Sequence, residues 1–386
     1  MQASPKCPLT RFTLFLIIAF NLAPAILSAG TFSVISLGSL NGNDATATGI
    51  NSNGTQTVGY GIQNGLSFIA ATSAGTLNPL GYSGQANAVN DSGQIVGTNG
   101  STQAFVYQNG SMTTLNYLAG QSSWATGIND AGLIVGAGTT VAGQTVATYW
   151  KNGTAYQIGL LGGSFSSAYG VNANGEVAGT SQVPNGAMAA FTWSSGGAMH
   201  NLGTLGGVNS YGAAINDSGW VVGDSQIASG YTHAFLWNGT AMVDLGTLGG
   251  ANSYATGISD AGQIVGWSQT ASGQMDAFIY ENGVMYDLNS LLPIGSGWNI
   301  SMANGIDANG DIVGIGTDNG VQYAVELADP PTANPLSVSP APEPTSALLM
   351  GLGLLGIAFV IHRTRTAKAT QTLRVVSRPT ANPPLA

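Results

Sequence analysis

Apolar residues in this chain form short runs that glycine-rich polar turns interrupt at a regular interval. A pattern close to small–apolar–Asn/Ser/Asp–x–x–Gly–x–x–Val–Gly occurs seven times between residues 49 and 314. Its anchors are Asn51, Asn90, Asn129, Asn172, Asn216, Ser259 and Asp307, at spacings of 39, 39, 43, 44, 43 and 48 residues. A period of about 43 residues with strand-like chemistry is typical of one four-stranded blade of a β-propeller.

Each period contains four apolar segments, each of strand length. In the sixth period these are residues 253–258, 262–269, 276–281 and 284–288. Ser259-Asp260-Ala261 joins the first two as an Asx-type turn, in which the anchor side chain caps its own backbone. The preceding GTLGG, residues 246–250, is expected to be the crossing from one blade to the next.

Asn-Gly joins the last two segments in several periods. Both residues accept positive φ, so the dipeptide predicts a two-residue type I′ hairpin turn. It stands at residues 109–110, 152–153, 238–239 and 282–283. Asn238-Gly239-Thr240 also matches a glycosylation sequon, although the turn explains the dipeptide without a sugar.

The two ends of the repeat region complement each other. The seventh period has its first two strands and then residues 321–327, but its fourth strand is missing, whereas residues 32–40 resemble 243–250 and precede the first copy. The N-terminal strand can therefore complete the last blade, which removes exposed sheet edges. We predict an all-β fold, a single seven-bladed β-propeller of four-stranded blades closed by that strand. A linear solenoid would need polar caps, which the sequence lacks.

One strand and its following segment carry the clearest form of the repeat. His233-Ala234-Phe235-Leu236-Trp237 is followed by Asn-Gly and by MVDLGTLGG, residues 242–250, and weaker forms stand at 103–107, 190–193 and 276–280. This combination resembles the HAF extracellular repeat family over residues 31–327. The resemblance implies an exported bacterial repeat protein and implies no established activity.

The N-terminus has the layout of a secretory signal peptide. Lys6 and Arg11 precede an apolar stretch, and small residues follow it at 23–25 and 28–30. We assign residues 1–29 to this signal. Cys7 is the single cysteine and lies within it, so the mature protein has no disulfide framework and no thiolate metal site.

The C-terminus has three parts: a Pro-rich linker at 328–344, an apolar transmembrane segment at 345–361 and a basic cytoplasmic tail at 362–386. Pro342-Glu343-Pro344, the glycine-rich apolar run, Arg363 and Arg365 resemble the PEP-CTERM sorting signal of Gram-negative bacteria. That resemblance implies an exosortase-type processing enzyme, export machinery and display at the cell envelope or release from it. The tail continues well beyond the arginines, which departs from the family pattern.

Charge restricts the partners further. Only 6% of residues are charged, and Lys151 is the one basic residue between 31 and 330, where sixteen of the seventeen acids lie. Such a surface cannot neutralise phosphates, so we expect no nucleic-acid partner. A Gly-x-Gly-x-x-Gly pattern occurs at 351–356, but it lies in the membrane segment and follows no strand, so it does not indicate a dinucleotide site.

Few residues offer metal or acid–base chemistry. His200 and His233 lie in different strand registers of adjacent repeats, so we assign them no metal or catalytic role. Asp307-Ala308-Asn309-Gly310-Asp311 resembles half of a calcium loop but lacks the bidentate Glu at position twelve. Turn capping explains the anchor residues, with weak surface calcium as the alternative; we expect no cofactor.

A register on the first strand of each repeat is the best candidate for binding, because it lines the channel of a propeller. Its members are Thr46, Gln85, Trp124, Ser167, Tyr211, Tyr254 and Met302. Aromatic rings at a channel mouth stack on sugars. We therefore take Gln85, Trp124, Tyr211 and Tyr254 as candidate ligand-binding residues, with packing between blades as the alternative.

These observations predict an exported, non-catalytic, monomeric repeat protein with a surface-binding or extracellular-matrix role. An extracellular polysaccharide is the partner that the channel aromatics suggest. The first alternative function is a carbohydrate-binding lectin that uses those aromatics. The second is a secreted hydrolase or lyase, which needs paired acids or an acid beside His or Tyr in the channel.

Overall fold

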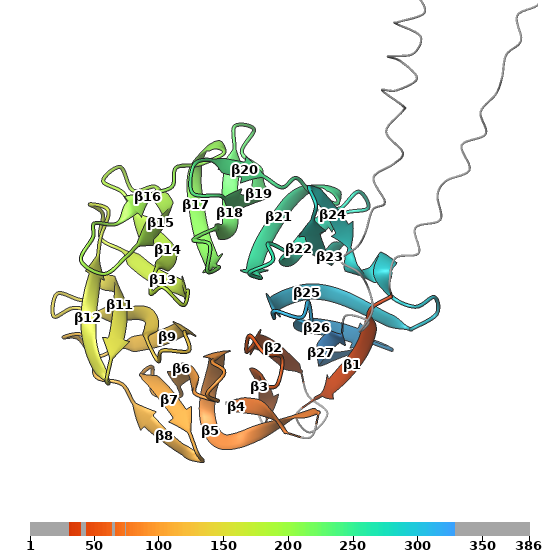
Figure 1. Ribbon diagram of the computed structural model, residues 1–386, viewed down its shortest axis with the longest axis horizontal. Coiled ribbons are helices and arrows are strands. Elements are labelled where there is room, and N and C mark those ends of the chain that lie inside the picture. Colours follow the sequence, from red (N-terminus) through yellow and green to blue (C-terminus); the bar gives the residue numbers. More distant parts are fainter. Residues whose placement is uncertain (1–30, 40–43, 64–65, 74, 329–386) are drawn as a thin grey trace, which may run out of the picture. The chain divides into compact units, whose positions relative to one another are not determined.

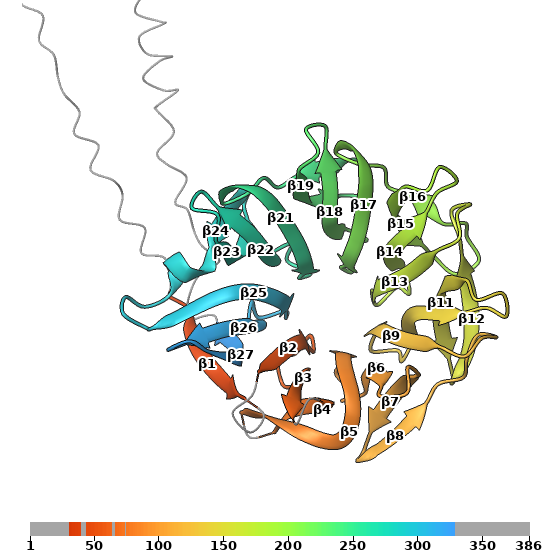
Figure 2. The same cartoon turned by 180° about the vertical axis from the view of Figure 1, so that it is seen from behind.

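The repeats fold into antiparallel β-sheets that stand around a common axis (Figure 1, and from behind Figure 2). The computed structural model describes residues 31–39, 44–63, 66–73 and 75–328, which belong to one unit, Gly30–Ala333. The described residues form twenty-seven strands and a short 3₁₀ helix, η1 (Leu288–Leu291). None of their helices is long and apolar enough to cross a membrane, and the predicted segment 345–361 lies outside them.

The first and last strands of the unit share one sheet. Its order is β1 (Ser33–Gly38), β27 (Val321–Ala328), β26 (Ile312–Asp318) and β25 (Trp298–Ile306). Val34 lies opposite Leu327 and Ile35 opposite Glu326. The predicted pairing of the N-terminal strand with residues 321–327 is thereby confirmed.

Four further sheets each contain the four consecutive strands that one period predicts. They comprise β9 (Ser123–Ile128), β10 (Ile134–Thr139), β11 (Thr145–Lys151) and β12 (Thr154–Gly159); β13 (Ser166–Val171), β14 (Val177–Gln182), β15 (Met188–Trp193) and β16 (His200–Asn201); β17 (Gly206–Ile215), β18 (Val221–Ile227), β19 (Thr232–Trp237) and β20 (Met242–Asp244); and β21 (Gly249–Ile258), β22 (Ile264–Thr270), β23 (Met275–Glu281) and β24 (Val284–Asp287). The GTLGG prediction needs a correction, because Gly249 and Gly250 belong to β21 and Gly249 lies opposite Thr270.

The first two periods share one strand. Their sheet runs β2 (Ala45–Ile50), β3 (Thr57–Gln63), β4 (Leu66–Ser73), β5 (Thr76–Val89), β6 (Ile95–Asn99), β7 (Ala104–Gln108) and β8 (Ser111–Thr114). β5 pairs with β4 through residues 76–83 and with β6 through residues 84–89. The described residues thus form six sheets, five of four strands and one of seven, where the sequence predicts seven separate sheets.

The glycine that ends each repeat unit is required by a bulge in the neighbouring strand. We call the first strand of each repeat, which lies nearest the common axis (Figure 1), its inner strand. Each inner strand contains a bulge, at which its pairing with the next strand of the sheet shifts register. The inner strands are β2, β5, β9, β13, β17, β21 and β25. At Gly223 a Cβ atom would overlap the carbonyl oxygen of Tyr211, and the same overlap occurs at Gly59, Gly97, Gly136, Gly179, Gly266 and Gly314. These glycines permit close backbone approach, which is a structural role.

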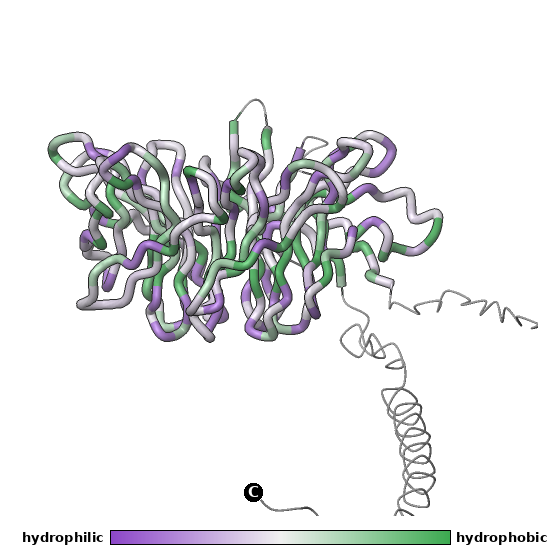
Figure 3. The backbone as a smooth tube through the Cα atoms, turned by 90° about the horizontal axis from the view of Figure 1, so that it is seen from above, coloured by the Kyte–Doolittle hydropathy of each residue, from purple (hydrophilic) through white to green (hydrophobic). Residues whose placement is uncertain are grey.

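The hydrophobic core lies between neighbouring sheets. Phe278 of β23 is fully buried and packs with Val222 and Ala234 of the preceding sheet. Phe105, Phe191 and Phe235 occupy the same position in their own sheets. In the edge view of Figure 3 the strands carry hydrophobic residues through the middle of the unit, and hydrophilic residues gather mostly at the loops.

Candidate functional site in the central channel

The seven turns meet at one end of the channel, and their anchor side chains cap them as predicted. In every turn the anchor oxygen accepts the backbone N–H four or five residues later, at 2.8–3.2 Å: Asn51 from Gln56, Asn90 from Gln94, Asn129 from Leu133, Asn172 from Glu176, Asn216 from Trp220, Ser259 from Gln263 and Asp307 from Asp311. The anchors are buried. Turn capping therefore explains all seven copies of the motif.

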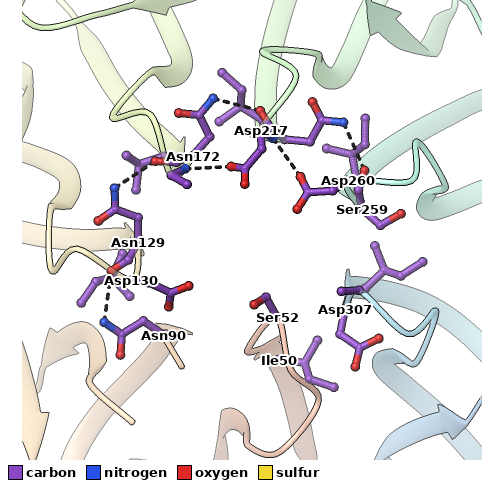
Figure 4. A pocket seen from close by; sticks show the side chains of 18 of the residues that line it. Ile50, Ser52, Asn90, Asn129, Asp130, Asn172, Asp217, Ser259, Asp260 and Asp307 are labelled. Carbon is purple, nitrogen blue, oxygen red and sulfur yellow. Dashed lines mark hydrogen bonds between the residues drawn. The ribbon is translucent and has the colours of Figure 1, made fainter. Parts of the chain in front are cut away.

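The same anchors also connect neighbouring turns, which the sequence analysis missed. The Nδ2 of Asn90 donates to the carbonyl of Asn129 at 3.1 Å, Asn129 donates to Asn172 at 2.9 Å, and Asn172 donates to Asn216 at 2.9 Å. Figure 4 shows these amides following one another around the pocket at the channel end. With the bond from Asn216 to the carbonyl of Ser259 at 3.1 Å, these links join five of the seven turns, so the hydrogen bonds at this end have a structural role.

A second ring of hydrogen bonds lies deeper in the channel. One side chain of an inner strand donates to a carbonyl of the next inner strand at 2.7–2.9 Å: Thr48 to Ala86, Asn87 to Ala125, Thr126 to Ala168, Thr256 to Ala303 and Asn304 to Ala47. The last of these connects β25 to β2. Five of the seven contacts between neighbouring inner strands are bonded in this way.

Two neighbouring contacts lack that bond, and we call them the open seams: β13–β17 and β17–β21. The donor position is occupied there by Tyr169 and Ala213, whose side chains form no such bond within the described residues. At the β13–β17 seam the backbone N–H of Gly212 donates instead to the Thr180 hydroxyl at 3.2 Å. The described channel wall thus lacks this side-chain hydrogen bond at the two seams.

A cavity of about 590 Å³ lies in the part of the channel away from the turns; it is lined at the open seams and also by the bonded donors Thr48, Asn87, Thr256 and Asn304. Tyr169, Tyr211 and Asp224 line it at the open seams, Thr46 and Met302 line it from the inner strands β2 and β25, and Tyr60 lines it from β3, opposite Thr46. Tyr169 and Tyr211 are both 39% exposed. Asp224 is the one acid among the described residues that line the cavity, and no base lines it.

Asp224 lies directly opposite Tyr211 in the β17–β18 ladder. Burial raises the pKa of the Asp224 carboxyl to about 7. Burial also raises the pKa of the Tyr211 hydroxyl, with smaller contributions from Asp224 and Tyr169. At neutral pH the cavity therefore presents a carboxyl close to its midpoint beside the neutral phenol of Tyr211.

The structure does not bring all four predicted binding residues together, although burial and then the charge of Asp224 raise the pKa of both Tyr211 and Tyr254. Tyr211 lines the cavity, whereas Tyr254 stacks on Trp267 of its own sheet with ring centroids 3.9 Å apart. Trp124 is half-buried opposite Ala137, and Gln85 is exposed opposite Thr98. Neither Trp124 nor Gln85 lines this cavity.

Sequence reasoning missed Tyr169 and Asp224. Asp224 directly follows the repeat glycine Gly223, so it is the cross-strand neighbour of a channel residue. The cross-strand partner of each register position could have been found from the hairpin spacing alone.

The remaining candidate groups have other contacts. The Nδ1 of His233 lies 2.9 Å from the Asp244 carboxylate, and the His200 ring lies 5.9 Å from the Trp237 ring. Asp307 accepts the N–H groups of Asn309 and Asp311 at 2.8 Å. Within the described ranges no three His, Cys, Asp or Glu side chains form a group that could hold a metal ion.

Comparison with protein families identifies the C-terminal signal. The PEP-CTERM protein-sorting motif matches residues 340–363, which include Pro342, Glu343, Pro344 and Arg363 and lie outside the described residues. This match suggests export to the cell envelope or surface and processing by an exosortase-type enzyme. No curated protein matches the chain.

Several solved structures resemble the unit. A puromycin-hydrolyzing peptidase from Mycobacterium tuberculosis matches with a TM-score of 0.53 and 10% identity over 79% of this chain and 55% of its own. A putative TolB from Agrobacterium tumefaciens matches with 0.45 and 10% over 78% and 99%, and the BP39L lectin from Burkholderia pseudomallei with 0.46 and 10% over 75% and 96%. The chain spans about half of the peptidase, and the likeness to that structure concerns the fold alone.

Proposed function

We propose that this protein is an exported, non-catalytic binding protein of the bacterial cell envelope, built on a seven-bladed β-propeller that β1 closes. The sorting motif at 340–363 supports export. The seven inner strands around the axis support seven blades, with β5 serving as the outer strand of one blade and the inner strand of the next.

The ligand binds in the 590 Å³ cavity beside the open seams. The observation that carries this proposal is the interruption of the inter-strand bonds at Tyr169 and Ala213, because the remaining ring positions use their polar groups within the fold. Two partly exposed phenol rings and one carboxyl suit a neutral saccharide, with ring stacking and hydroxyl hydrogen bonds. This is the lectin function, placed on Tyr169, Tyr211 and Asp224.

A glycan array with the full-length protein tests the proposal. Tyr211→Ala should weaken the binding of any retained glycan about tenfold, as expected for loss of an aromatic contact. Gln85→Ala is the matched control, since Gln85 is exposed and does not line the cavity. An array without any bound glycan, or equal losses in both variants, contradicts the proposal.

A hydrolase or lyase is the second candidate, and the position of Asp224 opposite Tyr211 favours it specifically. A carboxyl with a pKa of about 7 suits general acid–base catalysis near neutral pH. Asp224→Asn distinguishes the two functions. An enzyme would lose turnover of the bound glycan by roughly 100-fold or more while still binding it, whereas a lectin releases no product in either form.

A further inference from the structure

Two further cavities, separate from the channel cavity, occupy equivalent places between neighbouring sheets on the turn side of the unit. One, of 380 Å³, lies between the β9–β12 and β13–β16 sheets; the other, of 330 Å³, lies between the β13–β16 and β17–β20 sheets. Repeat-equivalent pairs line them: Leu133 and Glu176, Tyr149 and Thr192, Lys151 and Ser194, Gly175 and Gly219, and Trp193 and Trp237. The differences between the pairs therefore distinguish the chemistry of the two cavities.

The first cavity, which we call the Lys151 pocket, has an aromatic wall. Tyr149 stacks on Trp193 with centroids 5.4 Å apart and on Tyr156 with centroids 5.1 Å apart. The indole N–H of Trp193 donates to the carbonyl of Gly197 at 3.0 Å. The polar edge of Trp193 is thus already bonded, and ring carbon is what it can offer a ligand.

Lys151 gives this pocket a charge that the rest of the unit lacks. It is the one Lys or Arg among the described residues, and its side chain is exposed at the rim of the pocket. It forms no ion pair with any described residue. No other Lys or Arg among the described residues can attract an anionic ligand group. Lys151 is therefore the described position where such a group meets a full positive charge.

The second cavity shows the contrast. Glu176 stands where the Lys151 pocket has Leu133, and its carboxylate accepts a hydrogen bond from the Asn172 amide at 2.8 Å. Ser194 stands in place of Lys151. Glu176 therefore repels an anionic ligand from the second cavity, whereas Lys151 attracts it to the Lys151 pocket.

We propose that the Lys151 pocket binds an acidic sugar unit, a uronic acid, of an extracellular polysaccharide. Lys151 holds the carboxylate while the pyranose ring packs against the half-buried Tyr149 and the small exposed part of Trp193, which is 8% exposed. Asn152, Asn174 and Ser195 line the pocket and face the hydroxyl groups. The volume of 380 Å³ lies within the range of small-ligand sites. The site is separate from the channel cavity, so it does not depend on ligand binding there.

Calorimetric titration of the full-length protein with a galacturonate oligosaccharide tests the proposal, with a neutral maltose oligosaccharide of the same length as the comparison ligand. We expect binding of the uronate alone, weakening as salt is added. Lys151→Met should reduce uronate affinity by about tenfold or more, the loss expected for a charge-assisted hydrogen bond, and Lys151→Arg should retain most of it.

Glu176→Gln, at the equivalent cavity, is the matched control and should leave uronate affinity unchanged. Circular dichroism of each variant verifies folding, which is expected because Lys151 is exposed. Equal affinity for the neutral oligosaccharide, or full uronate affinity in Lys151→Met, overturns the proposal. Uronate affinity lost in Tyr211→Ala but kept in Lys151→Met would instead assign the sugar to the channel, so the two sites are told apart.

Discussion

Among single residues, Asp224 has a raised pKa that links the stability of the fold to pH. Burial raises the pKa of its carboxyl from 3.8 to about 7, so the folded state binds the proton more tightly than the unfolded state does. Below about pH 3 both states are largely protonated and no penalty exists. The free energy of unfolding should fall as the pH rises from 3.8 to about 7 and should level off above pH 7.

Asp224→Asn removes that penalty. We expect the variant to be as stable as the parent near pH 3 and more stable by about 2 kcal/mol at pH 8, allowing for the solvent that reaches this half-buried group. Urea unfolding at a series of pH values measures the difference. Asp260→Asn, at an exposed turn position, is the control; a parallel pH dependence in both variants argues against an Asp224 effect.

Gly223 illustrates why the repeat ends in glycine. A Cβ atom there would overlap the carbonyl of Tyr211, since the bulge in β17 brings that oxygen against β18. Gly223→Ala should lower the free energy of unfolding by about 3 kcal/mol. Gly197→Ala, whose Cβ would lie 3.3 Å from the nearest atom, should change it by less than about 1 kcal/mol. Chemical denaturation compares the two.

For the strands, the inter-strand hydrogen bonds give a paired prediction. Asn304→Ala removes the bond to the carbonyl of Ala47 and leaves that acceptor without its side-chain donor, so it should cost about 1–2 kcal/mol. Ala213→Thr supplies the missing donor at an open seam. We expect a modest rise in melting temperature and loss of ligand binding in the channel cavity, because the seam closes.

Calorimetry and the glycan array check both variants. If Ala213→Thr left the melting temperature and the binding unchanged, then the absent bond would have no bearing on the cavity. Thr126 forms this bond in the parent, so Thr126→Ser, which keeps the hydroxyl, is a control expected to behave like the parent protein.

The hairpins show where the local sequence predicts the turn type correctly and where it does not. Asn109, Asn152 and Asn282 have φ of 51°, 51° and 52°, each followed by a glycine with positive φ, as the type I′ prediction requires. The prediction is wrong at residues 238–239. Trp237 lies opposite Met242, so the loop has four residues, and the Asn238 side chain accepts the N–H groups of Thr240 and Ala241.

At the scale of the unit, the sequence predicted the elements better than the contacts between them. The period, the turn caps and the pairing of β1 with β27 follow from local pattern and from matching ends. The bonds from Asn90 to Asn129 and from Thr48 to Ala86 join residues 39 and 38 positions apart. Nothing local indicates such partners, so the open seams could not be located from the sequence, whereas Asp224 follows from the hairpin spacing as the cross-strand neighbour of Tyr211.

The pairing of β1 with β27 has a consequence for unfolding if, as proposed, β1 closes the ring. In a closed ring each blade packs against two neighbours, so weakening one blade weakens all of them. A linear array would instead lose its terminal sheet first. Leu37 of β1 is 1% exposed and packs with Ala45, Ala47 and Val313, which belong to two different sheets.

Leu37→Ala should therefore lower the free energy of unfolding by about 3 kcal/mol and shift a single cooperative transition, with the same midpoint by circular dichroism and by tryptophan fluorescence. Ile35, 40% exposed on the same strand, is the control, and Ile35→Ala should change stability by less than about 1 kcal/mol. An early, separate transition confined to β25–β27, detected as selective hydrogen exchange in those strands, would show that β1 packs locally without closing the ring.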